Sequence, residues 1–142
     1  MGGSYLYPLQ YSTDGINFKP GGAGLKDYAV NIAFSDGLHG IMSGAGGGSG
    51  DFNQVFFTKD GGVSWNQTYL DYETYQPVGV KGTLIFYAIR EYNINLGLGN
   101  IGQVIRSLDG GITWQTTYQY WNHARYSVTG TIQSGSNLKL FF

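Results

Sequence analysis

The sequence predicts an all-β protein built from repeated four-stranded units within one domain. Three observations lead to this fold class. A short motif recurs three times along the 142 residues, 24 glycines and an aromatic content of 16% are spread through the chain, and no stretch sustains the 3.6-residue period of a helix. Short runs of aromatic and β-branched residues between glycine-rich segments are typical of strands joined by tight turns. One domain with a core of reasonable size is expected at this length.

The repeated motif joins a Ser or Thr, an Asp two residues later, one or two glycines, and an aromatic residue. It is complete at Thr58–Trp65 and Ser107–Trp114, and a copy one residue shorter stands at Ser12–Phe18. The aspartates are spaced by 46 and 49 residues (14 to 60 and 60 to 109), which suits one four-stranded blade of a β-propeller. The motif predicts a hairpin in which the Asp accepts backbone N–H bonds across the turn, Gly adopts positive φ, and the aromatic side chain folds back.

Alternation and strand-forming residues place the units in order along the chain. Residues 1–25 hold the third and fourth strands (C and D) of a blade, at about 5–12 and 16–20. Two complete blades follow: residues 26–71, with strands at about 29–34, 40–43, 54–58 and 64–69, and residues 72–120, with strands at about 76–80, 84–89, 102–107 and 113–118. Residues 121–142 hold only the first and second strands (A and B), at about 126–133 and 138–142. The chain therefore contains three blade equivalents, one of them split between its two ends.

Three blades in a row leave two faces uncovered, whereas typical propellers close with four to eight blades. We expect two copies to form a six-bladed ring, in which each split blade combines strands A and B of one chain with strands C and D of the other. The alternative is that the chain completes a larger propeller or assembly. A closed ring of three blades is least favoured, because it would strain the angle between blades. Unpaired strand edges favour completion by another chain, because bare edges promote aggregation.

The repeated motif resembles the Asp-box, also called the BNR repeat, of sialidases, sortilin-type sorting receptors, the photosystem II stability-factor family, and phage and bacterial surface proteins. The segment Phe34–Gly44 is also similar to a stability-factor blade. The resemblance implies propeller blades in which the box forms the turn between strands C and D, opposite the usual ligand face. It therefore implies structural roles for the box residues Asp14, Asp60, Asp109, Phe18, Trp65 and Trp114.

Catalysis by this chain is not expected. A sialidase needs three convergent arginines, a Tyr–Glu pair and a separate acid, and the only arginines here are Arg90, Arg106 and Arg125. Glu91 and Tyr92 are adjacent on an expected strand end, so their side chains point to opposite faces. A glycosidase-like fragment is therefore the most distant of the functions considered.

Metal, cofactor, nucleic-acid and membrane functions are not expected either. His39 and His123 have no carboxylate at ligand spacing, the chain has no Cys, and the glycine-rich stretch 44–50 lacks the Lys-Ser/Thr of a phosphate-binding loop. A formal net charge of −1 supplies no basic surface, and no apolar run approaches the ~20 residues of a membrane span. No export signal is visible, yet the low charge and the Gly-, Tyr-, Asn- and Ser-rich composition favour an extracellular, virion or cell-surface setting.

Aromatic residues gather in the two expected connections from strand D of one blade to strand A of the next, at 69–75 and 118–126. Aromatic faces beside amides and a few charges are typical of carbohydrate sites, although the same residues could pack between blades. The candidate ligand-binding residues are Tyr72, Tyr75, Trp121, Asn122, His123, Arg125 and Tyr126. The predicted function is a non-catalytic module that recognises glycans or surfaces, and the alternative is a structural scaffold or assembly factor that binds protein partners.

Overall fold

The computed structural model describes residues 9–25, 28–45, 54–70, 73–93, 100–122, 130–134 and 137–141. Within these ranges the regular elements are twelve β-strands, and no helix occurs. Every pair of neighbouring strands is antiparallel. The all-β class that the sequence predicts is confirmed.

The strands form two sheets of four and two sheets of two, and each sheet contains strands that are consecutive in the chain. The two-stranded sheets are β1 (Gln10–Tyr11) with β2 (Lys19–Pro20), and β11 (Gly130–Ser134) with β12 (Asn137–Phe141). The first four-stranded sheet, sheet 1, contains β3 (Tyr28–Phe34), β4 (Gly40–Ala45), β5 (Gln54–Thr58) and β6 (Asn66–Tyr69). The second, sheet 2, contains β7 (Glu73–Gly79), β8 (Phe86–Asn93), β9 (Asn100–Ser107) and β10 (Gln115–Asn122).

The strands of sheet 2 extend further than the sequence indicates. Tyr75, Trp121 and Asn122 each have a partner residue in the neighbouring strand, so they do not lie in connections between blades. The prediction that 69–75 and 118–126 connect one blade to the next is therefore wrong at Tyr75, Trp121 and Asn122. The reason is that ladder hydrogen bonds join backbone N–H and C=O groups, which every residue but proline carries, so polar and aromatic residues can prolong a strand.

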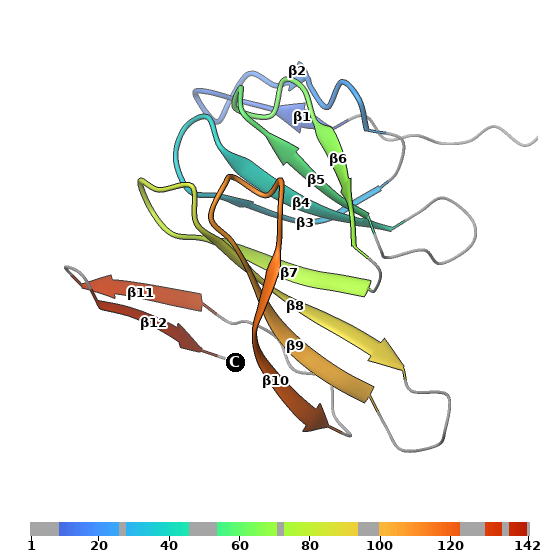
Figure 1. Cartoon of the computed structure of the whole chain (residues 1–142). Helices are drawn as coiled ribbons and strands as arrows, with labels where there is room; N and C mark the ends of the chain where they lie inside the picture. The colour runs from blue at the N-terminus through green and yellow to red at the C-terminus, as the bar shows by residue number, and fades with distance from the viewer. Residues whose placement is uncertain are drawn as a thin grey trace, which may run out of the picture.

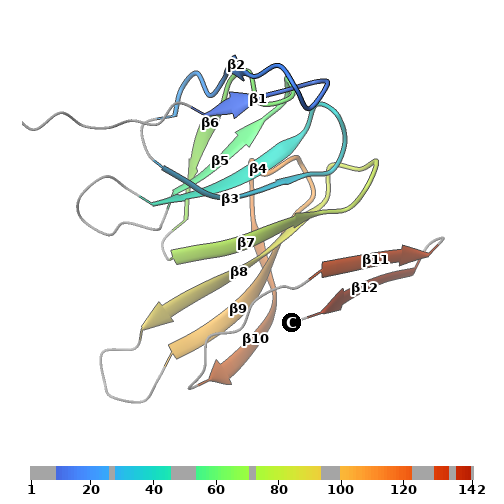
Figure 2. The ribbon, with the colours of Figure 1, turned by 180° about the vertical axis from the view of Figure 1, so that it is seen from behind.

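Sheet 1 is the central layer of the molecule (Figures 1 and 2). The N-terminal hairpin β1–β2 lies on one side of it, sheet 2 lies on the other, and β11–β12 lies at the far end of the stack, where β11 contacts β7. Because side chains alternate along a strand, neighbouring residues of β4 and β5 enter different cores. Sheet 1 therefore contributes to two separate apolar interfaces.

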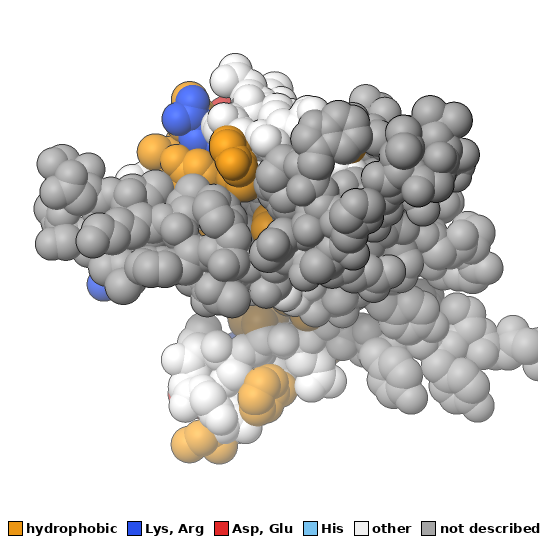
Figure 3. Space-filling model, turned by 90° about the horizontal axis from the view of Figure 1, so that it is seen from below, with side chains coloured by type: hydrophobic (Ala, Val, Ile, Leu, Met, Phe, Trp, Pro, Cys, Tyr) orange, Lys and Arg blue, Asp and Glu red, His pale blue; other side chains and the backbone are white. Residues whose placement is uncertain are grey.

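The first interface joins sheet 1 to sheet 2. Its fully buried residues are Ile41, Val55 and Phe86, and the partly buried side chains packed on them are Phe57, Leu70 and Trp114. The second interface joins sheet 1 to the N-terminal segment. Its buried residues are Met42, Phe56 and Trp65, covered by Leu9 and Leu25. In Figure 3, a view from below, the described part of the surface shows several hydrophobic side chains and few charged ones.

The backbones of the two four-stranded sheets come close together where β7 ends. A Cβ on Gly79 would lie 2.8 Å from the carbonyl carbon and oxygen of Phe34 and from the nitrogen of Ser35, all of them backbone atoms. Beside it, the Gly82 N–H donates to the Ser35 carbonyl at 2.7 Å. A residue without a side chain is therefore needed at position 79.

We expect Gly79→Ala to destabilise the protein by about 1–3 kcal/mol, because the backbone of the β3–β4 turn would have to move away from the added methyl group. The measurement is thermal denaturation followed by circular dichroism. Gly37→Ala, in the same turn, is the control, since its Cβ would meet no heavy atom within 4 Å. Equal melting temperatures for the two variants would show that the close approach does not constrain the fold.

Candidate functional site

The three copies of the repeated motif, called box 1 (Ser12–Phe18), box 2 (Thr58–Trp65) and box 3 (Ser107–Trp114) below, share one hydrogen-bond pattern. In each, the first hydroxyl donates to Oδ1 of the Asp, at 2.9, 2.8 and 2.8 Å in chain order. The same hydroxyl oxygen accepts a glycine N–H, at 2.8, 2.9 and 2.8 Å. These donors are Gly15, Gly62 and Gly111. One Ser or Thr thus joins the carboxylate to the turn backbone.

The aspartates close the other side of each turn. Oδ1 accepts the backbone N–H of the residue before the aromatic one, at 2.8, 2.9 and 2.9 Å. Oδ2 accepts a bond from the side chain of that same residue, at 2.7, 2.5 and 2.6 Å. The donor residues are Asn17, Ser64 and Thr113. Both oxygens of each box carboxylate are therefore engaged within its own turn.

The aromatic residues of boxes 2 and 3 return over the glycines. Trp65 Nε1 donates to the Gly62 carbonyl and Trp114 Nε1 to the Gly111 carbonyl, each at 3.0 Å. Trp65 also meets the Phe34 ring edge-on, with centroids 6.2 Å apart. The acceptor glycines have φ of +90° and +93°, a conformation that L side chains rarely adopt. The turn thus fixes the indole against the core.

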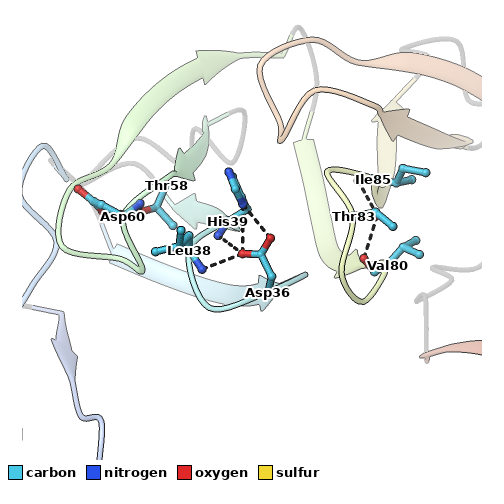
Figure 4. A network of polar contacts seen from close by, with 8 residues as sticks. All are labelled: Asp36, Leu38, His39, Thr58, Asp60, Val80, Thr83 and Ile85. Atoms are coloured by element: carbon cyan, nitrogen blue, oxygen red, sulfur yellow. Dashed lines mark hydrogen bonds and ion pairs between the residues drawn. The ribbon is translucent and has the colours of Figure 1, made fainter.

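Backbone hydrogen bonds connect these turns to others at the same end of the molecule. Gly61 N–H donates to the Leu38 carbonyl at 2.9 Å, and Gly110 N–H donates to the Leu84 carbonyl at 3.0 Å. Boxes 2 and 3 are therefore each tied to the turn between the first two strands of their own sheet. The β3–β4 turn is itself closed by Asp36, whose Oδ1 accepts the N–H groups of Leu38 and His39, each at 2.7 Å (Figure 4).

These bonds lower the pKa of the turn carboxylates. The His39 and Leu38 N–H groups hold the pKa of Asp36 at about 2, and the bonds from Ser64 hold that of Asp60 at about 2. Bonds from Asn17 hold the pKa of Asp14 far below its ordinary value. Partial burial raises the pKa of Asp109, but the bonds donated in its turn outweigh burial and lower it overall.

A row of polar side chains crosses the strands of sheet 2, and it is called the polar row below. Strand register places its members opposite one another on β7, β8, β9 and β10: Thr74, Arg90, Gln103 and Gln119. The Arg90 guanidinium donates to Gln103 Oε1 from Nε at 3.0 Å and from Nη2 at 2.5 Å. Gln103 Nε2 then donates to Gln119 Oε1 at 2.8 Å.

The polar row runs from the interior to the surface. Thr74 and Gln103 are 3% and 8% exposed, Arg90 is half-buried and Gln119 is exposed. Arg90 lies two and four positions beyond Ala88 and Phe86 on β8, so it shares their face of the sheet. The row therefore fixes a guanidinium and two amides as directional donors and acceptors at the edge of the core.

The predicted ligand-binding residues fall into two groups. Tyr72, His123, Arg125 and Tyr126 lie outside the described residues, and of Tyr75, Trp121 and Asn122 only the backbone is described. The backbone of this second group lies near the polar row, since Tyr75 follows Thr74 on β7 and Trp121 lies two positions beyond Gln119 on β10. Sequence reasoning missed Gln103 and Gln119, whose relation to Arg90 depends on strand register.

The described residues contain no group of three or more His, Cys, Asp or Glu side chains that could hold a metal ion. Among these same residues, no helix is long and apolar enough to cross a membrane. Comparisons of the chain with protein-family models, with curated proteins and with solved structures found no match.

We expect Asp109→Ala to destabilise the protein by about 1–3 kcal/mol, because the buried Ser107 hydroxyl and the N–H groups of Ile112 and Thr113 lose their acceptor. Equilibrium unfolding in urea measures the change. Leu108→Ala is the control, since Leu108 is exposed in the same turn. A free energy of unfolding for Asp109→Ala equal to that of the control would refute the role of the carboxylate.

Acid should weaken the fold through the same carboxylates. Their folded-state pKa values lie below the ordinary 3.8, so the stability that they add is complete above about pH 4 and is lost as the pH falls toward 2. We expect the melting temperature to fall across this window, and to fall less in Asp60→Asn, which has one such carboxylate fewer. A melting temperature unchanged between neutral pH and pH 2 would contradict this account.

Proposed function

We propose that the chain is a segment of an Asp-box β-propeller that recognises carbohydrate without catalysing a reaction. Two consecutive four-stranded meanders support the propeller, because each carries a box at the same place, the β5–β6 and β9–β10 turns. The packing of β7 against β3 and β4, and of β11 against β7, supports it further, since first strands of successive blades meet around a propeller axis.

Completion of the ring by a second copy belongs to the same proposal. A blade buries its faces against its neighbours, so a stack of two complete sheets and two hairpins leaves surfaces that need cover. Two copies would supply six blade equivalents. The low charge of the chain, −1 overall, adds little repulsion between identical copies.

The polar row is the observation that carries carbohydrate recognition. Sugar hydroxyl groups need donors and acceptors at fixed positions, and the bonds among Arg90, Gln103 and Gln119 hold such groups in place. Trp121 and Asn122 lie on the same strand as Gln119, just beyond it. Aromatic and amide side chains together suit the apolar and polar faces of a sugar ring.

The described carboxylates support a function without catalysis. General acid–base chemistry needs a carboxyl group that can exchange a proton with the substrate. Each carboxylate whose side chain is described accepts hydrogen bonds within its own turn, which lowers its pKa: Asp14, Asp36, Asp60 and Asp109. These groups stabilise turns and are poorly suited to proton transfer near neutral pH.

An array of bacterial, plant and animal glycans tests the proposal, and titration calorimetry with the best glycan then gives the affinity. We expect Arg90→Gln to bind about 10- to 100-fold more weakly than wild type, because a charge-assisted hydrogen bond is lost. Lys59→Gln, in box 2 of sheet 1, should bind as wild type does. Binding of no glycan by the wild type, or equal binding by Arg90→Gln, would overturn carbohydrate recognition.

A protein partner is the second candidate, and one observation favours it. Large apolar side chains are exposed by 40–56% at the tips of the turns that the backbone bonds tie together: Leu38, Val63, Leu84, Leu108 and Ile112. Grouped exposed apolar residues are typical of protein interaction surfaces. This surface is formed by turns, whereas the polar row lies within the strands of sheet 2. The absence of glycan binding by the wild type in the array would therefore favour the protein partner.

A further inference from the structure

The aromatic residues of the three boxes differ in burial. Trp65 is 4% exposed beneath the N-terminal segment, and Trp114 is partly buried against sheet 1. Each of them packs on the element that precedes its own sheet in the stack. Phe18 holds the same place in box 1, but it is 61% exposed. Phe18 therefore lacks, in the described part of the chain, the cover that its two counterparts have.

The contact made by box 3 defines what box 1 lacks. Trp114 packs on the core of sheet 1, and the space that a Cβ on Gly111 would occupy is filled by the side chains of Ile41 and Phe57. Ile41 and Phe57 are opposite each other on β4 and β5, one step from the residue that begins box 2. This cross-strand pair is the surface that receives the next box in the stack.

Sheet 2 has a pair at the corresponding position. Tyr87 and Arg106 are opposite each other on β8 and β9, one step from Ser107, which begins box 3. Both are partly buried, and Arg106 Nε is enclosed without a hydrogen-bond partner among the described residues. A buried donor of this kind calls for an acceptor, and the described residues do not supply one.

Box 1 fits this pair chemically. An Arg guanidinium over a phenyl ring makes a favourable cation–π contact, and Arg106 stands where sheet 1 has the apolar Phe57. Phe18 has no indole N–H, so the Gly15 carbonyl does not receive the bond that Trp114 gives to Gly111. That carbonyl is an acceptor suited to a donor from another element.

A second, independent difference links box 1 to the β11–β12 hairpin. In both complete sheets the first glycine of the box, Gly61 or Gly110, donates its N–H to the turn between the first two strands. Box 1 is one residue shorter. Gly15 donates its N–H to the box hydroxyl, as the second glycine does in boxes 2 and 3. The residue missing from box 1 is therefore the first glycine, which in the other boxes donates to the neighbouring turn.

The β11–β12 connection lacks the other half of that contact. Ser134 pairs with Asn137, so only two residues connect the strands, compared with five between β3 and β4 and six between β7 and β8. A turn this short has no segment equivalent to the one that bears Leu38. The shortened turn and the shortened box therefore match as parts of one blade. They lie at opposite ends of the stack (Figures 1 and 2), so one chain cannot pair them in this conformation.

We propose that Phe18 of one copy packs against Tyr87 and Arg106 of a second copy, beside a blade that combines β1–β2 of the first with β11–β12 of the second. This inference rests on the two-chain ring of the proposed function. It adds the residues that form the contact and makes Arg106 the partner of the Phe18 ring. The contact between copies repeats the one that box 3 makes with sheet 1 inside the chain.

Light scattering after size-exclusion chromatography tests the contact through molar mass. Wild type should have twice the chain mass of 15.5 kDa. Phe18→Lys and Arg106→Glu should each weaken the dimer at least about 100-fold, the first by repelling Arg106 and the second by removing the cation. The double variant should regain the dimer, because the new Lys and Glu attract each other. Asn66→Lys, at the exposed position just after box 2, is the control and should keep the wild-type mass.

The outcomes separate this contact from the rest of the proposal. A dimeric wild type whose mass is unchanged by Phe18→Lys would overturn the contact and leave the two-chain ring standing. A wild type that runs as a monomer would overturn both, and glycan binding on the array would still decide carbohydrate recognition. Dissociation in both single variants without recovery in the double variant would overturn the pairing of Phe18 with Arg106.

Discussion

The hydrogen bonds accepted by the box aspartates are the interactions on which the remaining structure depends. A tight turn leaves several N–H groups without backbone acceptors, and one carboxylate satisfies two or more of them while a Ser or Thr hydroxyl satisfies the glycine. With the turn closed in this way, the indole packs on the core and donates to the second glycine of the box. The first glycine, Gly61 or Gly110, donates its N–H to the neighbouring turn. A few polar atoms thus connect each of these turns to the core and to the neighbouring turn.

Repetition makes the departures from the pattern informative. Boxes 2 and 3 have the same length, the same indole-to-carbonyl bond and the same bond to a neighbouring turn. Box 1 keeps the carboxylate bonds but has lost one glycine and the indole. A turn needs its own N–H groups satisfied wherever it stands, whereas the glycine and the indole serve contacts with neighbours. Box 1 therefore shares the internal hydrogen bonds of boxes 2 and 3 but not their contacts with neighbouring elements.

The molecule presents two chemically different sets of groups. At the boxes, backbone-linked turns expose Leu and Val side chains beside carboxylates that are already engaged. Within sheet 2, an Arg and two Gln side chains bond one another across three strands. Rigid turns with apolar tips suit contacts with protein, while pre-positioned amides suit hydroxyl groups.

The sequence by itself determined the all-β class and the places of the box turns, because Gly, Asp and an aromatic residue at fixed spacing act locally, within one hairpin. Strand ends in sheet 2 were not predictable in this way, since residues such as Trp121 extend a strand only because a partner strand is present. The polar row could not be predicted without the register of the strands. Its members Arg90, Gln103 and Gln119 are far apart along the chain, and they come together only because three strands are aligned. The different burial of Phe18 and Trp65 likewise arose from stacking, because cover depends on which element lies above each turn, and that is decided by tertiary structure alone.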